Sequence, residues 1–401
     1  MSEDGGTIMN VQLNDSGVPI IRQKTFAQKV KSFLLWTILV ILTIAAALLV
    51  YLCVVGASEM AALTTLKKVS NQPYYTMSYE NFDYSDMLNQ ELPDNDHIIQ
   101  YYKKKFFKSA SGFFPGTNEN ETITKGSVAF FSRTFTSTYM RARIYNSYDA
   151  PIIMVTTKPQ NGYKSWNIVD MSDVGLISKQ DIAQWTDNTF QTIAASYCTS
   201  EGINQEGFGV SLISCPVAEC DDTSLVNITP FVAVRLLLDR TATVESAIDL
   251  LEGYDIDFSS GTYHFFISEK NQNSAIIEYI DGKMSVTYQA PDKAFQVCSN
   301  RMEYTSLPES DKDYSNLYNE ISLYDFFDKA LGAYQPGMSQ SYAQLLVSDK
   351  STDMAETSEL HFGTNMYGTL YSVFYDTNKM KMYIIVTNDT KSQSYNYDLS
   401  K

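Results

Sequence analysis

Hydropathy changes abruptly twice along the first 60 residues. Residues 1–31 are largely polar, whereas Ser32 to Ser58 holds no charged residue and is apolar nearly throughout. About 20 apolar residues are enough to cross the hydrocarbon core of a bilayer. Trp36 and Tyr51 lie near the two ends of this run, where amphipathic rings favour the membrane interface. The pattern predicts one transmembrane helix over 32–58.

Basic residues flank this segment unequally. Four precede it closely and only Lys67 and Lys68 follow it shortly; the four are Arg22, Lys24, Lys29 and Lys31. The positive-inside rule therefore predicts a single-pass protein with a cytoplasmic tail, 1–31, and an extracytoplasmic C-terminal domain. A cleaved secretion signal ending near Val55-Gly56-Ala57 is the alternative. The long polar leader and the length of the apolar run favour an anchor.

Beyond the membrane segment the pattern alternates between strand and helix. We expect 59–108 to be a helical or irregular stalk, followed by a domain over 109–390 and a polar tail, 391–401. Periodicity two and β-branched residues predict strands, whereas apolar positions at helical spacing predict helices. The expected strands are 126–135, 139–146, 151–157, 262–268, 274–280, 283–288, 370–375 and 380–386, and the expected helices are 230–239, 243–254 and a block over 313–347.

Two local signals sharpen these boundaries. Asp281-Gly282 is typical of a tight hairpin turn between the strands on either side. Thr243 is a good N-cap, with Ser246 three residues on, where a capping box more often has Glu. Runs of strands, then helices, then strands predict an α+β layered domain, not a doubly wound parallel sheet.

Composition excludes several classes of site. A net charge of -16 argues against nucleic acid as a partner, because phosphate binding needs concentrated Lys and Arg. The three histidines are isolated and no CxxC occurs, so we expect neither a metal nor another cofactor. Four cysteines follow the membrane segment, which leaves three possible pairings: Cys198, Cys215, Cys220 and Cys298.

Five segments in order resemble the linear-amide C–N hydrolases, the group that contains choloylglycine hydrolases and penicillin V acylases. The family blocks are TKP-x-x-GY-x-S, D-G-M-N-E-K-G-L, a hairpin ending in IEY-x-x-GK, Thr-Asn and W-S-V-V-Y-N. The matching segments are 157–165, 201–208, 265–283, 299–300 and 371–376. The resemblance implies a four-layer αββα N-terminal-nucleophile fold, in which two antiparallel sheets stack face to face between helices.

The resemblance also implies a mechanism and a set of site residues. A cysteine made N-terminal by processing attacks the amide carbonyl, with its own α-amine as base. Two asparagines stabilise the oxyanion, for which Asn204 and Asn300 are retained. An Arg-Asn-x-Asp motif follows the nucleophile by a short hairpin, and Arg133 matches its arginine. The nucleophile position reads Ala110, so the cysteine is missing. A distal arginine expected near 313–318 is missing too.

Two functional hypotheses follow from these matches. The first is a catalytically degenerate domain that binds an amide-like or lipid-like ligand, or a protein partner. The second is an active hydrolase that uses Ser111 or Ser109 as an N-terminal nucleophile after processing. Simpler roles also exist, since Asn204 is common in a Gly-flanked turn and Arg133 can pair with a surface carboxylate. Cys298 is expected as a buried thiol or half of a disulfide.

Overall fold

The structure is a computed structural model in two compact units, Met1–Val55 and Gly56–Lys401. It describes residues 25–69, 73–82, 85–88, 94–106, 126–147, 150–176, 182, 188–220, 224–271, 273–303, 321–334, 337–347, 360–362, 365–388 and 391–400.

The first unit contains one long helix, α1 (Phe26–Val55). It begins at Phe26 because Thr25 and Gln28 form a reciprocal cap, in which each backbone N–H bonds the other's side chain. The stretch Phe26–Leu48 is long and apolar enough to span a membrane. The helix therefore starts six residues before the segment predicted from the absence of charge.

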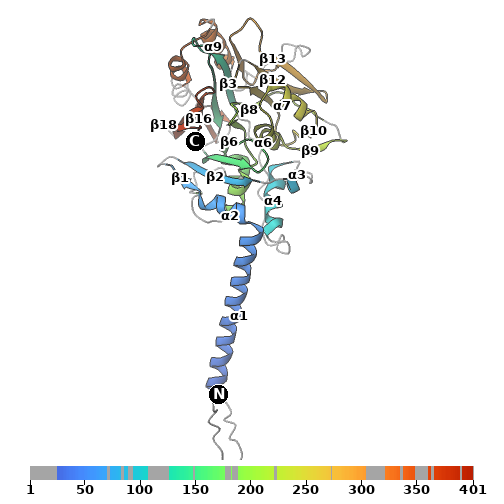
Figure 1. The fold of residues 1–401 in the computed structure, drawn as a ribbon, viewed down its shortest axis with the longest axis vertical. Coiled ribbons are helices and arrows are strands. Elements are labelled where there is room, and N and C mark those ends of the chain that lie inside the picture. Colours follow the sequence, from blue (N-terminus) through green and yellow to red (C-terminus); the bar gives the residue numbers. More distant parts are fainter. Residues whose placement is uncertain are drawn as a thin grey trace, which may run out of the picture. The chain divides into compact units, whose positions relative to one another are not determined.

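The second unit is built on two large sheets (Figure 1). The nine-stranded sheet has, in spatial order, β1 (Lys67–Lys68), β2 (Tyr74–Phe82), β5 (Ile152–Pro159), β6 (Ser165–Asp170), β7 (Glu201–Asn204), β8 (Gly209–Ser214), β11 (Tyr263–Ser268), β12 (Ser274–Ile280) and β13 (Lys283–Tyr288). Its neighbours are antiparallel except for the parallel pair β2–β5.

The seven-stranded sheet is antiparallel throughout its described pairs. Its order is β14 (Phe295–Cys298), β3 (Gly126–Arg133), β4 (Tyr139–Ser147), β16 (Asn365–Asp376), β17 (Lys381–Asn388) and β18 (Lys391–Asp398), with β15 (Leu360–Phe362) also pairing β16. A separate parallel pair joins β9 (Val226–Ile228) and β10 (Tyr254–Ile256).

Apolar side chains of both sheets meet in the layer between them. Ile168 and Ile203 of the larger sheet pack in one cluster with Val373 and Ile384 of the smaller sheet. In a second cluster, Phe266 of the larger sheet packs with Ala129 and Phe131 of the smaller sheet. Side chains alternate along each strand, so each sheet offers a second face to helices.

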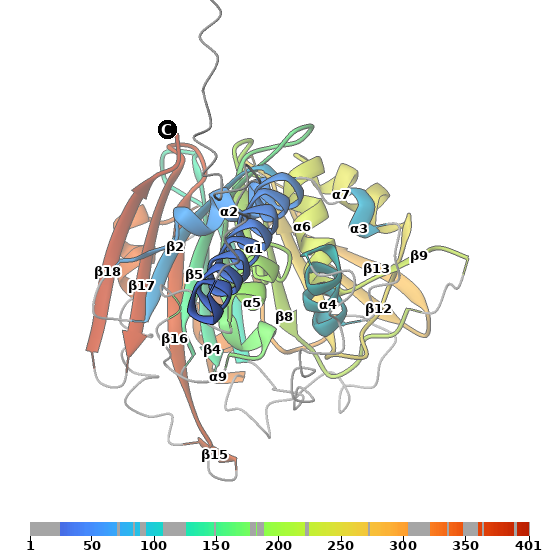
Figure 2. The same ribbon diagram turned by 90° about the horizontal axis from the view of Figure 1, so that it is seen from below.

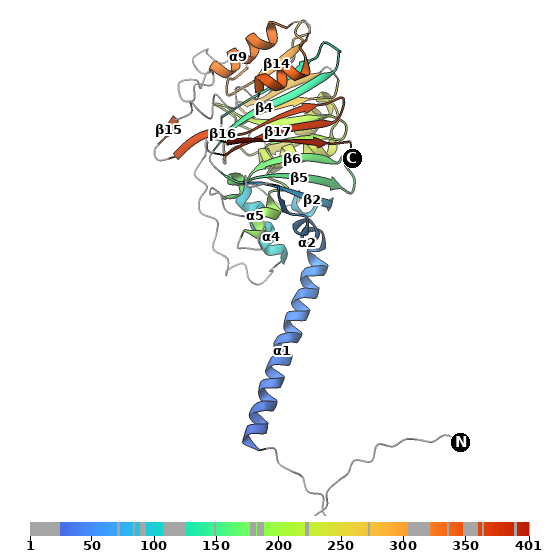
Figure 3. The same cartoon turned by 90° about the vertical axis from the view of Figure 1, so that its left-hand side faces the viewer.

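Helices cover both outer faces (Figures 2 and 3). On the nine-stranded sheet these are α2 (Ala57–Thr64), α4 (Asn95–Phe106), α5 (Thr189–Ala194), α6 (Pro230–Arg240) and α7 (Val244–Leu251), with the short α3 (Ser85–Leu88) and η1 (Met171–Val174) nearby. On the other sheet α9 (Ile321–Gly332) packs its Phe327 against Phe130, beside the helical stretch 340–347. The predicted αββα class is confirmed.

The local signals read from the sequence are also confirmed. Thr243 and Ser246 form a capping box at the start of α7. Asp281, at φ 51°, and Gly282, at φ 71°, turn β12 into β13. Both residues take the left-handed conformation that a type I′ hairpin turn requires.

Two predicted boundaries differ from the structure. The interval 59–108, expected as a stalk, supplies an inner strand, since β2 lies between β1 and β5. Glu59 of α2 is buried and pairs with Lys105 of α4 at 2.5 Å, which ties these helices together. Within the expected tail, 391–401, residues Lys391–Asp398 form β18, which pairs with β17 along its length. In β18 only Tyr395 and Tyr397 are half-buried, against the core between the sheets, and the other described residues of the strand are exposed, which is why this segment looks polar.

The position of β2 inside the sheet predicts a stability effect. Met77 of β2 is 3% exposed, so Met77→Ala should destabilise the outer unit by about 2–5 kcal/mol through the cavity it leaves. Exposed Glu80 of the same strand is the control, and Glu80→Ala should change stability by less than about 0.5 kcal/mol. Thermal unfolding of the full chain in detergent measures both. If both substitutions change stability negligibly, β2 is not part of the core and the prediction of a stalk over 59–108 stands.

Candidate functional site

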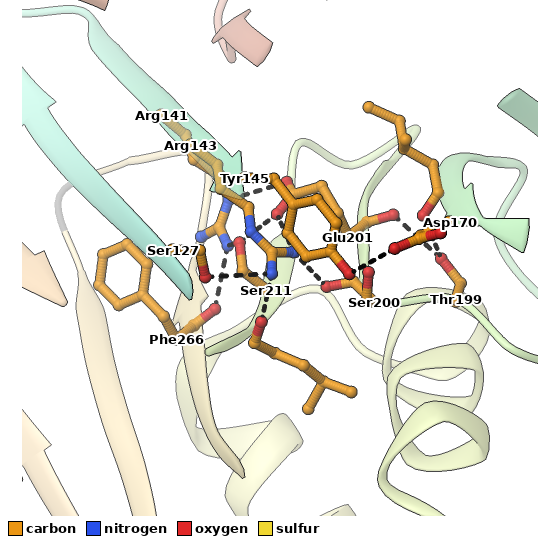
Figure 4. A network of polar contacts seen from close by, with 12 residues as sticks. Ser127, Arg141, Arg143, Tyr145, Asp170, Thr199, Ser200, Glu201, Ser211 and Phe266 are labelled. Atoms are coloured by element: carbon orange, nitrogen blue, oxygen red, sulfur yellow. Dashed lines mark hydrogen bonds and ion pairs between the residues drawn. The ribbon is translucent and has the colours of Figure 1, made fainter. Parts of the chain in front are cut away.

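Two arginines lie buried between the sheets. Arg141 and Arg143 alternate along β4, so both point into the inter-sheet layer, and neither is more than 1% exposed. Glu201, the first residue of β7, faces them from the other sheet. Its carboxylate lies 3.6 Å from Arg141 Nε and 3.3 Å from Arg143 Nη1. One carboxylate therefore serves two guanidinium groups (Figure 4).

Neutral oxygen atoms take up most of the remaining arginine donors. Arg141 donates to Ser268 Oγ at 2.9 Å, to the Phe266 carbonyl at 3.0 Å and to Ser211 Oγ, and Ser211 in turn donates to Glu201. The absence of a side chain at Gly209 makes this possible, since a Cβ there would lie 2.8 Å from Arg141 Cδ. Burial lowers the pKa of Arg141, and Glu201 partly offsets that effect.

The network extends from Arg143 in two directions. Its guanidinium stacks 4.6 Å from the Tyr145 ring, whose hydroxyl donates to Asp170 at 3.1 Å. Asp170 thus brings a second carboxylate to this layer. In the other direction, Arg143 Nη2 donates to Ser127 Oγ at 3.3 Å.

Ser127 is the second residue of β3 and only 1% exposed. Its backbone N–H donates to Asn300 Oδ1 at 3.4 Å. Asn300 follows β14, whose register pairs Cys298 with Ala129, and the same register continued places Asn300 opposite Ser127. The Nδ2 of Asn300 is buried and has no hydrogen-bond partner in the part of the chain that the structure describes. An unpaired buried donor of this kind costs free energy of folding, so its presence indicates a functional role such as hydrogen bonding to a ligand.

Asn204 lies on the other face of the nine-stranded sheet. It is three residues from Glu201, so its side chain faces α6. Its Nδ2 donates to the carbonyls of Leu238 and Thr241, and its Oδ1 accepts from the backbone N–H groups of Glu206 and Phe208. All side-chain polar capacity of Asn204 therefore joins the β7–β8 turn to the end of α6.

Arg133 lies at the last position of β3. Six residues separate it from Ser127, or about 20 Å along an extended strand. The structure consequently brings Asn300 together with Ser127 and Arg143, and not with Arg133 or Asn204. Ser109, Ala110 and Ser111 lie outside the described residues, as does the interval 313–318.

Sequence reasoning missed Ser127 and Arg143, although a signal was present. The resemblance requires a short hairpin between nucleophile and arginine, and the loop that Arg133 implies after 110 is long. Residues 134–138 form the tight turn between β3 and β4, so Ser127 and Arg143 flank a hairpin of the required kind. The sequence Arg143-Ile144-Tyr145-Asn146 then stands at the Arg-Asn-x-Asp motif, with Asn146 in place of Asp.

Three of the four cysteines after the long apolar segment are buried free thiols, namely Cys198, Cys215 and Cys298. Burial raises the pKa of the Cys215 thiol to about 12. Among the described residues, no group of three or more His, Cys, Asp or Glu side chains is arranged to hold a metal ion.

Comparison with known proteins yields one family and a few relatives. The family model for acyl-coenzyme A:6-aminopenicillanic acid acyl-transferase matches residues 179–391, more than half of the chain, and begins after β3 and β4. Penicillin V acylase from Pectobacterium atrosepticum is 26% identical over 137 residues, 29% of this chain. The chain covers 36% of that relative's length.

Two solved structures are similar at low identity. Penicillin V acylase from Agrobacterium tumefaciens has 15% identity and a TM-score of 0.41, over 68% of this chain and 86% of its own. A conjugated bile acid hydrolase variant from Clostridium perfringens has 12% identity and a TM-score of 0.44, over 69% and 94%. By the family-model match, the chain belongs to the acyl-coenzyme A:6-aminopenicillanic acid acyl-transferase family, within the penicillin acylase and choloylglycine hydrolase group that its sequence motifs resemble.

Proposed function

We propose that this protein is a membrane-anchored, extracytoplasmic hydrolase of linear amide C–N bonds, and that Ser127 is its nucleophile. One observation carries the proposal. Ser127 Oγ accepts a hydrogen bond from Arg143, and its backbone N–H donates to Asn300 Oδ1, while Asn300 Nδ2 has no partner among the described residues. A nucleophile, an electrostatic partner for it and a free oxyanion donor thus meet at the start of β3.

The chemistry requires a free α-amine on Ser127. Hydrolysis of the Gly126–Ser127 peptide bond, by addition of one water, would leave that amine next to Asn300 Oδ1. The amine then removes the hydroxyl proton as Oγ attacks the substrate carbonyl, and the protonated amine gives the proton to the leaving nitrogen. Water, deprotonated by the same amine, hydrolyses the resulting ester. Asn300 Nδ2 would donate to the tetrahedral oxyanion.

Arg143 supports the α-amine as a base. An ordinary α-amine has a pKa of about 7.7–8.0, and a nearby cation disfavours its protonated form. Arg143 is within hydrogen-bond distance of the Ser127 side chain and is fixed by Glu201 and two backbone carbonyls, so its charge acts from a constant position.

Cleavage before Ser127 would not release the domain from its membrane helix. The piece before Ser127 contributes β2, which pairs in parallel with β5 from Tyr74–Ile152 onward, and contributes α2 and α4 to the outer face of the sheet. Residues 1–126 would therefore stay bound to the rest of the domain through an internal strand.

A non-hydrolytic binding domain is the second candidate. Asn146, which stands where the family motif has Asp, accepts a hydrogen bond from Thr369 at 3.0 Å and carries no charge. A domain degenerate in this way would bind an amide-like or lipid-like ligand, or a protein, without turnover. Processing at Ser109 or Ser111 also stays a prediction, since both lie outside the described residues.

Intact mass and N-terminal sequencing of the mature protein separate these candidates. We expect two co-purifying chains, one beginning at Ser127, and a single uncut chain for Ser127→Ala. An uncut wild-type chain would favour the non-hydrolytic domain, because Ser127 then keeps an amide that cannot act as a base. A new terminus at Ser109 or Ser111 would contradict the assignment of Ser127.

Hydrolysis of a panel of N-acyl amides tests the site residues. Ser127→Ala should abolish turnover, while Asn300→Ala should lower kcat by about 10²–10³-fold, the usual cost of one oxyanion donor. Arg133→Ala is the matched control, because Arg133 lies at the far end of β3, and it should retain wild-type kcat. Loss of turnover in Arg133→Ala with full activity in Asn300→Ala would reverse the assignment.

The proposed orientation predicts opposite labelling of the two chain ends in intact cells. An epitope tag after Lys401 should bind antibody without permeabilisation, whereas a tag before Met1 should bind only after it. The basic residues Lys29 and Lys31 hold the N-terminus inside. The variant carrying Lys29→Glu and Lys31→Glu should show partial inversion. Antibody access to the N-terminal tag in intact wild-type cells would disprove the orientation.

A further inference from the structure

A second buried polar cluster lies behind Asn300. His264 of β11, Glu278 of β12 and Cys298 of β14 are each at most 1% exposed and point into the inter-sheet layer. His264 Nδ1 is 3.3 Å from Glu278 Oε1, and its Nε2 is 2.7 Å from the Ser299 carbonyl oxygen. The proposed reaction uses none of these groups directly.

The partners of His264 fix its protonation. A carbonyl oxygen can only accept, so Nε2 carries a proton and donates it to Ser299. Glu278 Oε1 also accepts from the Glu303 backbone N–H at 2.8 Å, as expected for a carboxylate, so Nδ1 is a donor as well. Burial alone would lower the pKa of His264, but Cys298 and Glu278 outweigh it and hold that pKa well above its ordinary value. His264 is therefore an imidazolium.

Cys298 also lies beside His264, but the closest polar contact of His264 Nε2 is with the Ser299 carbonyl oxygen. The Cys298 Sγ lies 3.7 Å from His264 Nε2, and Glu278 stands on the other side of the ring, which resembles a thiol–imidazole–carboxylate triad. Nε2 carries a proton that it donates to the Ser299 carbonyl at 2.7 Å, so the backbone at Ser299 is its main partner. The cluster therefore holds the backbone at Ser299.

Ser299 connects this cluster to the candidate site. Its carbonyl and the Asn300 N–H belong to one planar peptide unit, so fixing the carbonyl fixes the orientation in which Asn300 leaves the strand. The Asn300 Oδ1 accepts a hydrogen bond from the Ser127 backbone N–H. Its Nδ2 is buried and has no partner among the described residues. A shift of about 1 Å at such a donor costs about 10²-fold in rate.

We propose that His264, oriented by Glu278, is a positioning residue that aims the Asn300 carboxamide at the oxyanion of the proposed hydrolysis. This inference rests on the proposed function of Ser127 and adds His264, which lies just before the matched hairpin segment, together with Glu278 of the IEY-x-x-GK block. Glu278 Oε2 has no hydrogen-bond partner in the described part of the chain, so the ion pair with His264 is the main compensation for its buried charge.

Kinetics of His264 variants test the positioning role. The variant His264→Phe combined with Glu278→Leu removes the donor and the charge it would leave unpaired, and should lower kcat by about 10²-fold with KM within twofold, as for an interaction made only in the transition state. His264→Gln retains an N–H donor for Ser299 and should restore kcat to within tenfold of wild type. A folded double variant with wild-type kcat would overturn the proposal.

Nuclear magnetic resonance of the full chain in detergent gives a readout independent of turnover. The chain has three histidines, so His264→Gln assigns the His264 ring signals by their loss. Both ring N–H protons should persist at pH 7.5, where Glu278 and Cys298 face the ring and the Cys215 thiol is uncharged. A ring with no proton on Nε2 would overturn the proposal, because it could not donate to Ser299.

The Asn300 side-chain amide signal is assigned by its loss in Asn300→Asp. It distinguishes the positioning of Asn300 by His264 from the proposed hydrolysis. It should shift in the double variant and return toward the wild-type position in His264→Gln. If the wild type does not hydrolyse amides but this shift is seen, the proposed function fails and the positioning stands. If amides are hydrolysed and the shift is missing, only the positioning fails.

Discussion

The outer unit depends on charged groups buried between its two sheets. Arg141 and Arg143 project from one sheet and Glu201 from the other, so their ion pairs join the layers across the core. Removing such charges from water costs several kcal/mol per ion, and only good geometry with additional hydrogen bonds offsets that cost. Ser211, Ser268 and backbone carbonyls supply those bonds. A shift of one sheet against the other would break them together, which fixes the relative register.

The same network explains where a reactive group can lie. Ser127 is at the edge of the charged layer, where Arg143 reaches it, and Asn300 approaches from the neighbouring strand. His264 and Glu278 continue the polar layer behind Asn300. The candidate nucleophile, the proposed oxyanion donor and the residues proposed to position it thus lie together between the sheets, in an environment of low dielectric where hydrogen bonds and charges act strongly.

A different polar layer lies between the nine-stranded sheet and α6. Asn204 joins the β7–β8 turn to the end of α6, while Arg235 and Asp239 form an ion pair on that helix and Arg235 also reaches Ser165. Residues from the most recognisable sequence block therefore divide between two layers. Glu201 faces the candidate site and Asn204 faces the helix, because side chains alternate along a strand and positions three apart point to opposite faces.

The sequence alone determined the long apolar helix, the strands and helices with strong periodicity, the capping box at Thr243 and the turn at Asp281-Gly282, because each depends on residues that are close together in the chain. It also indicated the family through motifs of adjacent residues. Only the tertiary structure decided that Tyr74–Phe82 is an inner strand and that Lys391–Asp398 pairs with β17, because strand pairing joins distant segments. It likewise placed Ser127, and not Arg133, beside Asn300, since that meeting depends on the register of β3 with β14 across 173 residues of chain.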